Sequence, residues 1–489
     1  MIIKEISKKF LYSLFFVFYA WLIMYFLKFK DYHSLIWFSF VPVFYYIYYN
    51  SVSNKKIKIE LFCFSLTFMV SYLFGFTEIN RNLYVLIYLF AASWLYLVLF
   101  LSYKAIKINF YLPAIIFVLL EKILLDFLPF YSVSLFTVNG VYIKQFASLF
   151  GTSGITFVIV LFNLLITRLI IRKDNLKDVL FFTIILCLII SYGYFYINYE
   201  NNQDYINQKA LIVQTALTNE DKDYYFGGPL EIMELMVFYE ELIGNEEADI
   251  ILLPEASIKR DRIIENKGLF EDFPNILQEE LPRLSRKIES DMIIGITDYP
   301  VEQGDIIDNY LLYYDNEKEN YIYKYNKELM VPQYETSFKN YFMGFTTKEN
   351  KNFKKYKTLI CYEGLFENLM KQELKDNGAI FVLSNNNMLG KNKLPDEMLK
   401  FYILRSISLK RNIVVADNWG YSVMINQNGE IVSILDKYSR GKLTGNISLI
   451  YDQSFYYKHG YLFIYLNMII LIYVLKKSKK IPSNLKYMI

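Results

Sequence analysis

Long apolar runs separated by short polar intervals fill the first two hundred residues of the chain. An apolar stretch of about 20 residues spans the hydrocarbon layer of a membrane as a helix. Seven stretches approach that length and an eighth follows a long polar interval, so the pattern predicts a multi-pass membrane domain of about eight helices. The predicted helices cover residues 10–27, 34–49, 61–76, 83–101, 110–130, 155–171, 179–197 and 460–475.

The interval 209–457 has a different pattern, in which short β-rich runs alternate with amphipathic stretches. This alternation is typical of an α/β domain. Residues 421–425 and 430–435 are predicted to form a hairpin, because the residues between them favour a turn. The other predicted strands are 210–217, 249–253, 292–296, 358–361, 379–383 and 412–416, and the predicted helices are 230–243, 366–375 and 396–410.

These two patterns divide the chain into three parts. We expect a helical membrane domain over residues 1–200, an extramembrane α/β domain over 205–457, and a last membrane helix with a basic tail over 458–489. The first apolar run is long and no small-x-small site follows it, so we expect a retained helix rather than a cleaved signal.

Basic residues predict how the helices are oriented, because short cytoplasmic loops hold an excess of Lys and Arg. With the N terminus inside, the cytoplasmic loops hold clusters such as Lys55, Lys56 and Lys58. The opposite short loops hold only Lys28, Lys30, Arg81 and Lys144. The asymmetry predicts cytoplasmic N and C termini and places the α/β domain on the outer face of the membrane.

Composition narrows the partners and cofactors. The chain is 54% hydrophobic and 21% charged, which suits a membrane part joined to a polar part. Its net charge of +3 is small for 489 residues, and no basic patch is interleaved with aromatics, so we expect no nucleic-acid partner. Two histidines and three cysteines include no pair at metal-ligand spacing, so we expect neither a metal nor another cofactor.

Three segments carry polar residues just after an apolar run, where open α/β sheets present functional groups. They are 252–256 with Glu255, 325–332 with Lys327, and 359–363 with Cys361. A carboxylate can remove the proton of a thiol, and an ammonium beside a sulfur favours the thiolate and can stabilise an oxyanion. Together, these three residues would make an activated nucleophile that needs no histidine.

Each of the three residues also has a structural interpretation. A free cysteine at a strand end is usually a small buried hydrophobe. Taken singly, Glu255 fits a solvated loop acid and Lys327 a surface lysine better than a catalytic role. The predicted compartment favours function for Cys361. Because Cys63 and Cys187 lie in predicted membrane helices, Cys361 would be an unpaired thiol in a space where disulfides form.

The three segments, in this order, resemble the nitrilase (carbon-nitrogen hydrolase) superfamily, whose members use a Glu, Lys, Cys triad on an αββα sandwich. Residues 360–363, Ile-Cys-Tyr-Glu, resemble the nucleophile motif in full, and 331–335 resemble Val-Pro followed by a second glutamate, Glu335. The membrane helices around the α/β domain resemble those of apolipoprotein N-acyltransferases. Residues 151–163 are similar to that family's sixth helix, and Glu121 to the glutamate of its fifth.

The chain also departs from the family pattern. Residues 385–388, Asn-Asn-Asn-Met, stand where Asn-Asp-(Ala or Gly)-Trp is usual, and 405–408, Arg-Ser-Ile-Ser, replace Arg-Ala-(Ile or Val)-Glu. The Asn-Thr-Gly segment is Asn-Trp-Gly at 418–420. A tryptophan expected after the first strand is missing, with Tyr224 or Tyr225 nearby. These departures leave the triad intact and allow a changed substrate range or a weakened enzyme.

The resemblance implies acyl transfer at the outer face of a bacterial inner (cytoplasmic) membrane. Through a thioester on Cys361, a fatty acyl chain would pass from a phospholipid donor to the amino terminus of a diacylated apolipoprotein, at the surface of the lipid bilayer. The implied supporting residues are Glu335, Tyr362 and Glu363. The weaker candidates for substrate binding are Asn385, Arg405, Tyr224, Tyr225, Phe342 and Phe345. The last four lie in loops whose aromatic and glycine residues fit a mobile lid at the lipid surface and plain packing equally well.

Two alternatives stay open at this point. The triad could serve a membrane-tethered carbon-nitrogen hydrolase, an amidase or nitrilase, if water is the acceptor. The altered motifs could instead mark a non-catalytic lipoprotein-binding descendant.

Overall fold

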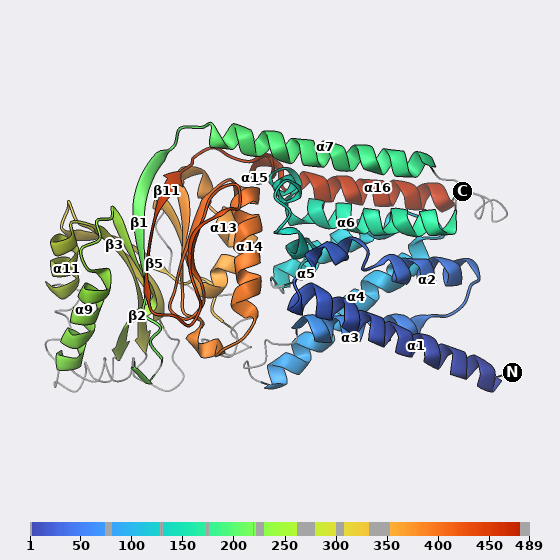
Figure 1. Cartoon of the computed structure of the whole chain (residues 1–489), viewed down its shortest axis with the longest axis horizontal. Coiled ribbons are helices and arrows are strands. Elements are labelled where there is room, and N and C mark those ends of the chain that lie inside the picture. Colours follow the sequence, from blue (N-terminus) through green and yellow to red (C-terminus); the bar gives the residue numbers. More distant parts are fainter. Residues whose placement is uncertain are drawn as a thin grey trace. The chain divides into compact units, whose positions relative to one another are not determined.

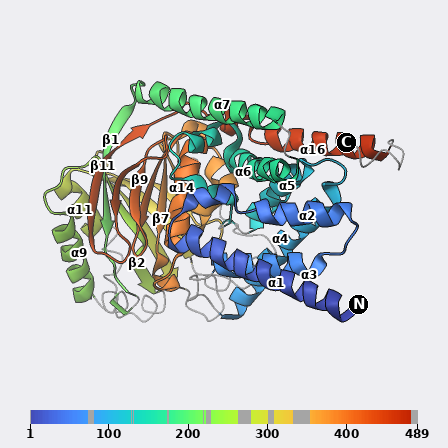
Figure 2. The same cartoon turned by 45° about the vertical axis from the view of Figure 1, so that its right-hand side comes forward.

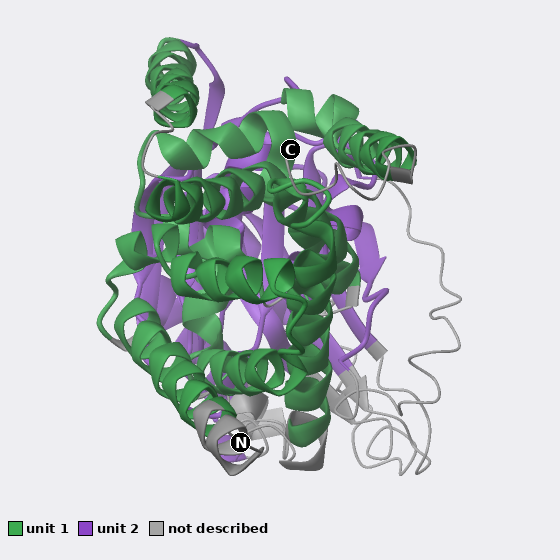
Figure 3. Ribbon diagram, turned by 90° about the vertical axis from the view of Figure 1, so that its right-hand side faces the viewer, with its two compact units in different colours: residues 1–202, 392–400, 454–489 green, residues 203–391, 401–453 purple. Residues whose placement is uncertain are grey.

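Helices form both ends of the chain and strands form its middle (Figure 1). The structure, a computed structural model, describes residues 2–73, 81–127, 129, 131–172, 176–218, 220–221, 229–261, 279–299, 308–331 and 353–479. The chain divides into two compact units. Unit 1 comprises residues 1–202, 392–400 and 454–489, and unit 2 comprises 203–391 and 401–453 (Figure 3).

Unit 1 is helical, and four of its described segments are long and apolar enough to cross a membrane: Lys9–Lys28, Val85–Ala105, Ile143–Ile171 and Lys177–Asn201. Its main helices are α1 (Ile2–Met24), α2 (Val41–Val52), α3 (Lys58–Leu73), α4 (Arg81–Ala105), α5 (Leu112–Phe127), α6 (Ala147–Ile171), α7 (Leu176–Asn201), α15 (Phe455–His459) and α16 (Leu462–Lys479). Helix α3 packs against α1 and α4, and α5 packs against α4 and α6. Apolar helices at the predicted places are confirmed, whereas eight spans remain a prediction.

The second predicted membrane helix, 34–49, is wrong at its start. The structure has a 3-10 helix, η2 (His33–Trp37), and α2 begins only at Val41. Pro42 explains the difference, because proline fits the first turn of a helix but breaks its interior. The buried side chain of Asn163 in α6 holds this region: its Oδ1 accepts from the backbone N of Phe40 at 2.9 Å, and its Nδ2 donates to the carbonyl oxygen of Ile36 at 3.1 Å.

Unit 2 contains two sheets. The first has the order β11-β1-β2-β3-β4-β5, with β1, β2 and β3 parallel, and the second has the order β10-β9-β8-β7-β6, with β6, β7 and β8 parallel. The strands are β1 (Ile206–Gln214), β2 (Ile250–Asp261), β3 (Asp291–Tyr299), β4 (Asp308–Asp315), β5 (Asn320–Asn326), β6 (Tyr356–Ile360), β7 (Ala379–Ser384), β8 (Asn412–Asp417), β9 (Ser422–Ile425), β10 (Ile431–Leu435) and β11 (Gly441–Leu449).

Alternating side chains give unit 2 two apolar layers. Ala210 and Ile212 of β1 share one buried cluster with Phe381 and Val414 of the other sheet, whereas Leu211 of β1 belongs to a second cluster. The second cluster includes residues from α9 (Pro229–Ile243) and α11 (Leu281–Ile288), which cover the outer face of the first sheet. Figures 1 and 2 show α14 (Leu394–Leu409) on the outer side of the second sheet, so the layers follow the order helix, sheet, sheet, helix.

The α/β prediction for this region is confirmed. All six predicted strands and the hairpin with its turn are present, and helices 230–243 and 396–410 are within two residues of their predicted starts. The predicted helix 366–375 is broken, because Glu373 takes a left-handed conformation, φ 57°, between α13 (Glu367–Lys371) and the 3-10 turn η7 (Leu374–Asp376). Strands β4, β5 and β11 and helix α11 were not predicted.

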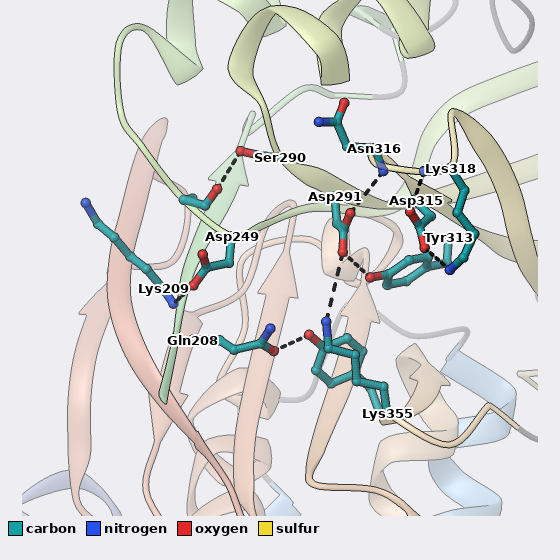
Figure 4. Close-up of polar contacts among 12 residues, drawn as sticks. Gln208, Lys209, Asp249, Ser290, Asp291, Tyr313, Asp315, Asn316, Lys318 and Lys355 are labelled. Atoms are coloured by element: carbon teal, nitrogen blue, oxygen red, sulfur yellow. Dashed lines mark hydrogen bonds and ion pairs between the residues drawn. The ribbon is translucent and has the colours of Figure 1, made fainter. Parts of the chain in front are cut away.

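Polar contacts tie the sheets together where the parallel strands begin (Figure 4). Asp291, the first residue of β3, accepts from the backbone N of Asn316 at 3.0 Å and from the Tyr313 hydroxyl, and its Oδ2 lies 4.0 Å from Lys355 Nζ. Asp249 accepts from the backbone N of Lys209 at 2.7 Å. Glu255 lies in the interior of β2 and Cys361 follows the last residue of β6, so this cluster at the strand starts supports the sandwich and is separate from the candidate chemistry.

Candidate active site

Glu255 lies at a bulge in the middle of β2. The register of β2 against β3 shifts between Leu253 and Ile258, and Ala256 takes a left-handed conformation with φ 55°. Gly295 of β3 packs directly against the bulge, since a Cβ there would lie 2.4 Å from the carbonyl oxygen of Pro254. A bulge turns a side chain out of the regular alternation of the strand. Here it presents a carboxylate just after the apolar run that begins β2.

Glu255 forms a buried ion pair with Lys327. Its Oε1 lies 2.9 Å from Lys327 Nζ, and the side chains are 7% and 0% exposed, respectively. Asn309 holds both partners: its Nδ2 donates to Glu255 Oε1 at 2.6 Å, and its carbonyl oxygen accepts from the backbone N of Lys327 at 2.8 Å. The strands β2, β4 and β5 therefore fix the carboxylate and the ammonium in one arrangement.

Cys361 directly follows the buried strand β6 and begins the 3-10 helix η6 (Cys361–Leu365). Its φ is 52°, in the left-handed region that side chains other than glycine rarely adopt. The residue is partly buried and packs against the apolar layer between the sheets. Such strained residues cluster at functional sites. The turn thus carries the thiol out of the strand in a conformation that packing alone does not require.

Glu363 connects the turn that carries Cys361 to the segment that carries Lys327. Its fully buried carboxylate accepts from the backbone N of Ile360 at 2.7 Å, from the backbone N of Leu329 at 3.0 Å and from the backbone N of Glu328. The Tyr325 hydroxyl donates a fourth hydrogen bond at 3.1 Å. Burial raises the pKa of Glu363 to about 7, while the backbone hydrogen bonds and the charge of Lys327 oppose that rise.

The departures at 385–388 and 418–420 meet in one buried network. Asn386 Nδ2 lies 2.5 Å from Asp417 Oδ2, and Asp417 Oδ1 accepts from the backbone N of Gly420 at 2.7 Å. Asn385 Oδ1 accepts from Asn418 Nδ2 at 3.2 Å. A carboxylate is therefore retained beside position 386, at the end of β8 rather than in the loop after β7. Burial raises the pKa of Asp417, and its backbone hydrogen bonds lower it.

The remaining predicted site residues are placed as follows. The ring of Tyr362 packs edge-on against Phe366 with a centroid separation of 4.9 Å. Arg405 of α14 is buried and pairs with Glu367 of α13 at 2.5 Å, so its visible role is to join two helices. The predicted residues Glu335, Phe342, Phe345, Tyr224 and Tyr225 lie outside the described residues.

The structure adds residues that sequence reasoning missed. Asn309 and Tyr325 carry no local motif, and each becomes informative only through its contact with Glu255 or Glu363. Asp417, which contacts Asn386, had a local signal as an acid at the end of an apolar strand. Among the described residues, no group of three or more His, Cys, Asp and Glu could hold a metal ion. The arrangement itself can supply a base, a cation and a nucleophile.

Comparison with known families gives two matches. Residues 209–456, slightly more than half of the chain, match the carbon-nitrogen hydrolase family. Residues 20–165 match the N-terminal domain of apolipoprotein N-acyltransferases. The first match covers the two sheets and the second covers most of the N-terminal apolar helices.

Curated relatives include two apolipoprotein N-acyltransferases from Haemophilus. The one from Haemophilus ducreyi is 22% identical over 66% of this chain and 66% of its own length, and the one from Haemophilus influenzae is 22% identical over 62% and 61%. The chain therefore spans less than two thirds of the length of these relatives. With the four apolar spans, such relatives indicate a bacterial membrane protein.

Solved structures resemble part of the chain only distantly. An amidase from Nesterenkonia sp. AN1 is 13% identical, covers 53% of this chain and 96% of its own, and has a TM-score of 0.37. A likeness at that TM-score carries no argument about function. The two family matches do, and the chain belongs to the carbon-nitrogen hydrolase family, in the branch that joins this domain to an apolipoprotein N-acyltransferase N-terminal domain.

Proposed function

We propose that this protein is an apolipoprotein N-acyltransferase in which Cys361 is the nucleophile, Glu255 the general base and Lys327 the oxyanion-stabilising cation. One observation supports the assignment most: the buried Glu363 carboxylate binds the residue before Cys361 and the residue after Lys327. It therefore couples the thiol to the buried ion pair. A purely structural ion pair would need no such link to a strained cysteine.

In the first half-reaction, Glu255 takes the thiol proton and the thiolate attacks the ester carbonyl of a phospholipid. Lys327 stabilises the oxyanion of the tetrahedral intermediate. The carbon-oxygen bond then breaks, and Glu255 gives the proton that it took from the thiol to the departing alkoxide. The products are a thioester on Cys361 and a lysophospholipid.

In the second half-reaction, the neutral amino terminus of a diacylglyceryl-cysteine apolipoprotein attacks the thioester. Glu255 takes a proton from the attacking amine, the carbon-nitrogen bond forms and the carbon-sulfur bond breaks. The proton on Glu255 returns to the thiolate. The product is a triacylated lipoprotein, and the enzyme is ready for another cycle.

Both substrates carry long acyl chains, and exposing a chain to water costs about 0.8 kcal/mol per methylene. A membrane enzyme avoids this cost because the chain can stay in the bilayer until it reaches the thiol. We place unit 2 on the outer face of the cytoplasmic membrane, as the distribution of Lys and Arg predicts.

The test is to capture the acyl-enzyme. Full-length protein, purified with phospholipid, is expected to carry one fatty acyl adduct that hydroxylamine removes and that peptide mass spectrometry places on Cys361. A Cys361→Ser variant should lose this labile adduct, and Cys187→Ser, which changes an exposed cysteine in α7, should keep it.

The acceptor is then tested on the loaded protein. A synthetic diacylglyceryl-cysteine peptide should remove the adduct and gain one acyl chain on its amine. Release of free fatty acid at the same rate with and without the peptide would show that water is the acceptor and would refute the transferase. No adduct under any condition would refute the role of Cys361.

A further inference from the structure

The hydroxyl of Tyr402 is a buried polar group that the proposed mechanism leaves unused. Tyr402 lies in α14 and is 2% exposed. No described residue forms a hydrogen bond with its oxygen. Most buried hydroxyls in folded proteins have a partner, so an unpaired one calls for an explanation.

This hydroxyl lies against the turn that presents Cys361. Its oxygen lies 3.0 Å from the place where a Cβ on Gly364 would be, and Gly364 belongs to η6, whose first residue is Cys361. Val382 Cγ1 of β7 lies 3.0 Å from the same position. Because Gly364 has no side chain, the phenol reaches the backbone of the nucleophile turn.

The Tyr402 hydroxyl stays protonated. Burial raises its pKa well above the usual value for tyrosine, and the negative charges of an ionised Cys361, of Asp417 and of Glu255 act in the same direction. A protonated phenol can donate a hydrogen bond to an anion. Two of these three anions already have donors, since Glu255 is bound by Lys327 and Asn309, and Asp417 by backbone amides and Asn386.

The third anion forms only when Cys361 is ionised. We propose that Tyr402 is a positioning residue whose hydroxyl donates a hydrogen bond to the negative charge that develops at the Cys361 centre. The inference rests on the proposed function, because it takes Cys361 as the nucleophile. Tyr402 would then be a neutral hydrogen-bond donor that acts on Cys361 together with the Lys327 ammonium, and it comes from α14.

The test measures the pH dependence of Cys361 alkylation by iodoacetamide in the full-length protein in detergent, followed on the peptide that contains Cys361. Tyr402→Phe removes one oxygen and keeps the ring. It should raise the midpoint pH of alkylation by about one unit, because a hydrogen bond to a charged group favours the thiolate by about that much. Below the midpoint, alkylation should slow about tenfold.

Tyr314→Phe is the matched control, because Tyr314 is also a buried tyrosine whose hydroxyl has no partner among the described residues. It should leave the midpoint unchanged. Incorporation of 3-fluorotyrosine at position 402, which gives a stronger donor of nearly the same shape, should lower the midpoint pH of alkylation. This protein replaces Tyr402→Phe in the test if the phenylalanine variant does not fold.

Three results separate the possible failures. An unchanged midpoint in Tyr402→Phe, or in the fluorotyrosine protein, would overturn the role of Tyr402 while Cys361 remains reactive. An equal shift in the Tyr314→Phe control would also overturn it. If the wild-type Cys361 is not alkylated at any pH, the proposed nucleophile itself is wrong.

Discussion

Replacing Lys327 by methionine tests how much the buried ion pair contributes to the stability and the proposed acyl transfer of the protein. The methionine keeps most of the volume of the lysine stem and removes the ammonium. Glu255 then remains buried with a negative charge that has lost its cation at 2.9 Å. The variant should therefore unfold more easily than the wild type and lose acyl transfer.

The magnitude follows from the distance and the burial. At 2.9 Å, two unit charges attract by about 6 kcal/mol when the effective dielectric constant is about 20, and desolvation of both groups offsets part of that. Removing one partner of a buried pair costs about 3–5 kcal/mol. For a unit of the size of unit 2, that loss should lower the melting temperature by about 6–20 °C.

Thermal unfolding of the single variants and of the double variant Lys327→Met/Glu255→Gln measures the coupling directly. The double variant has no unpaired charge, so it should recover more than half of the stability lost by Lys327→Met. The deficit of Lys327→Met should also shrink toward acidic pH, where the isolated carboxylate takes up a proton.

An exposed ion pair is the matched control. Lys318 and Asp315 lie 2.6 Å apart in the turn between β4 and β5, but the lysine is 66% exposed (Figure 4). Lys318→Met should leave the melting temperature unchanged, because solvent screens exposed pairs. If Lys327→Met proves equally harmless, or if the single losses simply add in the double variant, the reasoning from burial is refuted.

Three further predictions concern the framework of the site. Gly295→Ala should cost about 2 kcal/mol of unfolding free energy, because its Cβ meets the backbone of Pro254 at 2.4 Å, while Gly445→Ala, which meets the flexible Met424 side chain, should cost less. Asn386→Asp places a second buried carboxylate beside Asp417 and should lower the free energy of unfolding by about 3 kcal/mol at neutral pH. Adding Asp417→Asn to this variant should restore the stability, and a failure to restore it would contradict the pairing. Glu363, with its pKa raised to about 7, contributes stability below pH 4.5 that is lost as the pH rises toward 7. Chemical denaturation should therefore show that the wild type loses about 3 kcal/mol of unfolding free energy relative to Glu363→Gln between pH 4.5 and pH 7. Parallel pH profiles of the two proteins would refute this prediction.

The sequence predicted the parts of the fold that have a clear period or composition. Buried strands such as β7 and β8 are continuous apolar runs, and the turn at Gly429 has the residues that a hairpin favours. Strands β4 and β5 escaped because tyrosines fill both of their faces, which hides the alternation of apolar and polar residues. The start of α2 was missed because the apolar run continues across Pro42.

The candidate site was only partly predictable for a similar reason. Glu255, Lys327 and Cys361 come just after apolar runs in the sequence, so a local pattern marks them. Asn309 and Tyr402 lie far from the triad in sequence and acquire meaning only through contacts that the fold creates. The hydrogen bond between Asn386 and Asp417 was equally hidden, because the two residues are 31 positions apart.

The left-handed backbone at Cys361 sets stability against the proposed activity at a single position. A residue with a Cβ is disfavoured there by about 1–2 kcal/mol relative to glycine, so the protein gives up stability to keep the thiol. Glycine would relieve that strain and remove the sulfur in the same change, so a gain in backbone stability at this turn would come with loss of the proposed acyl carrier.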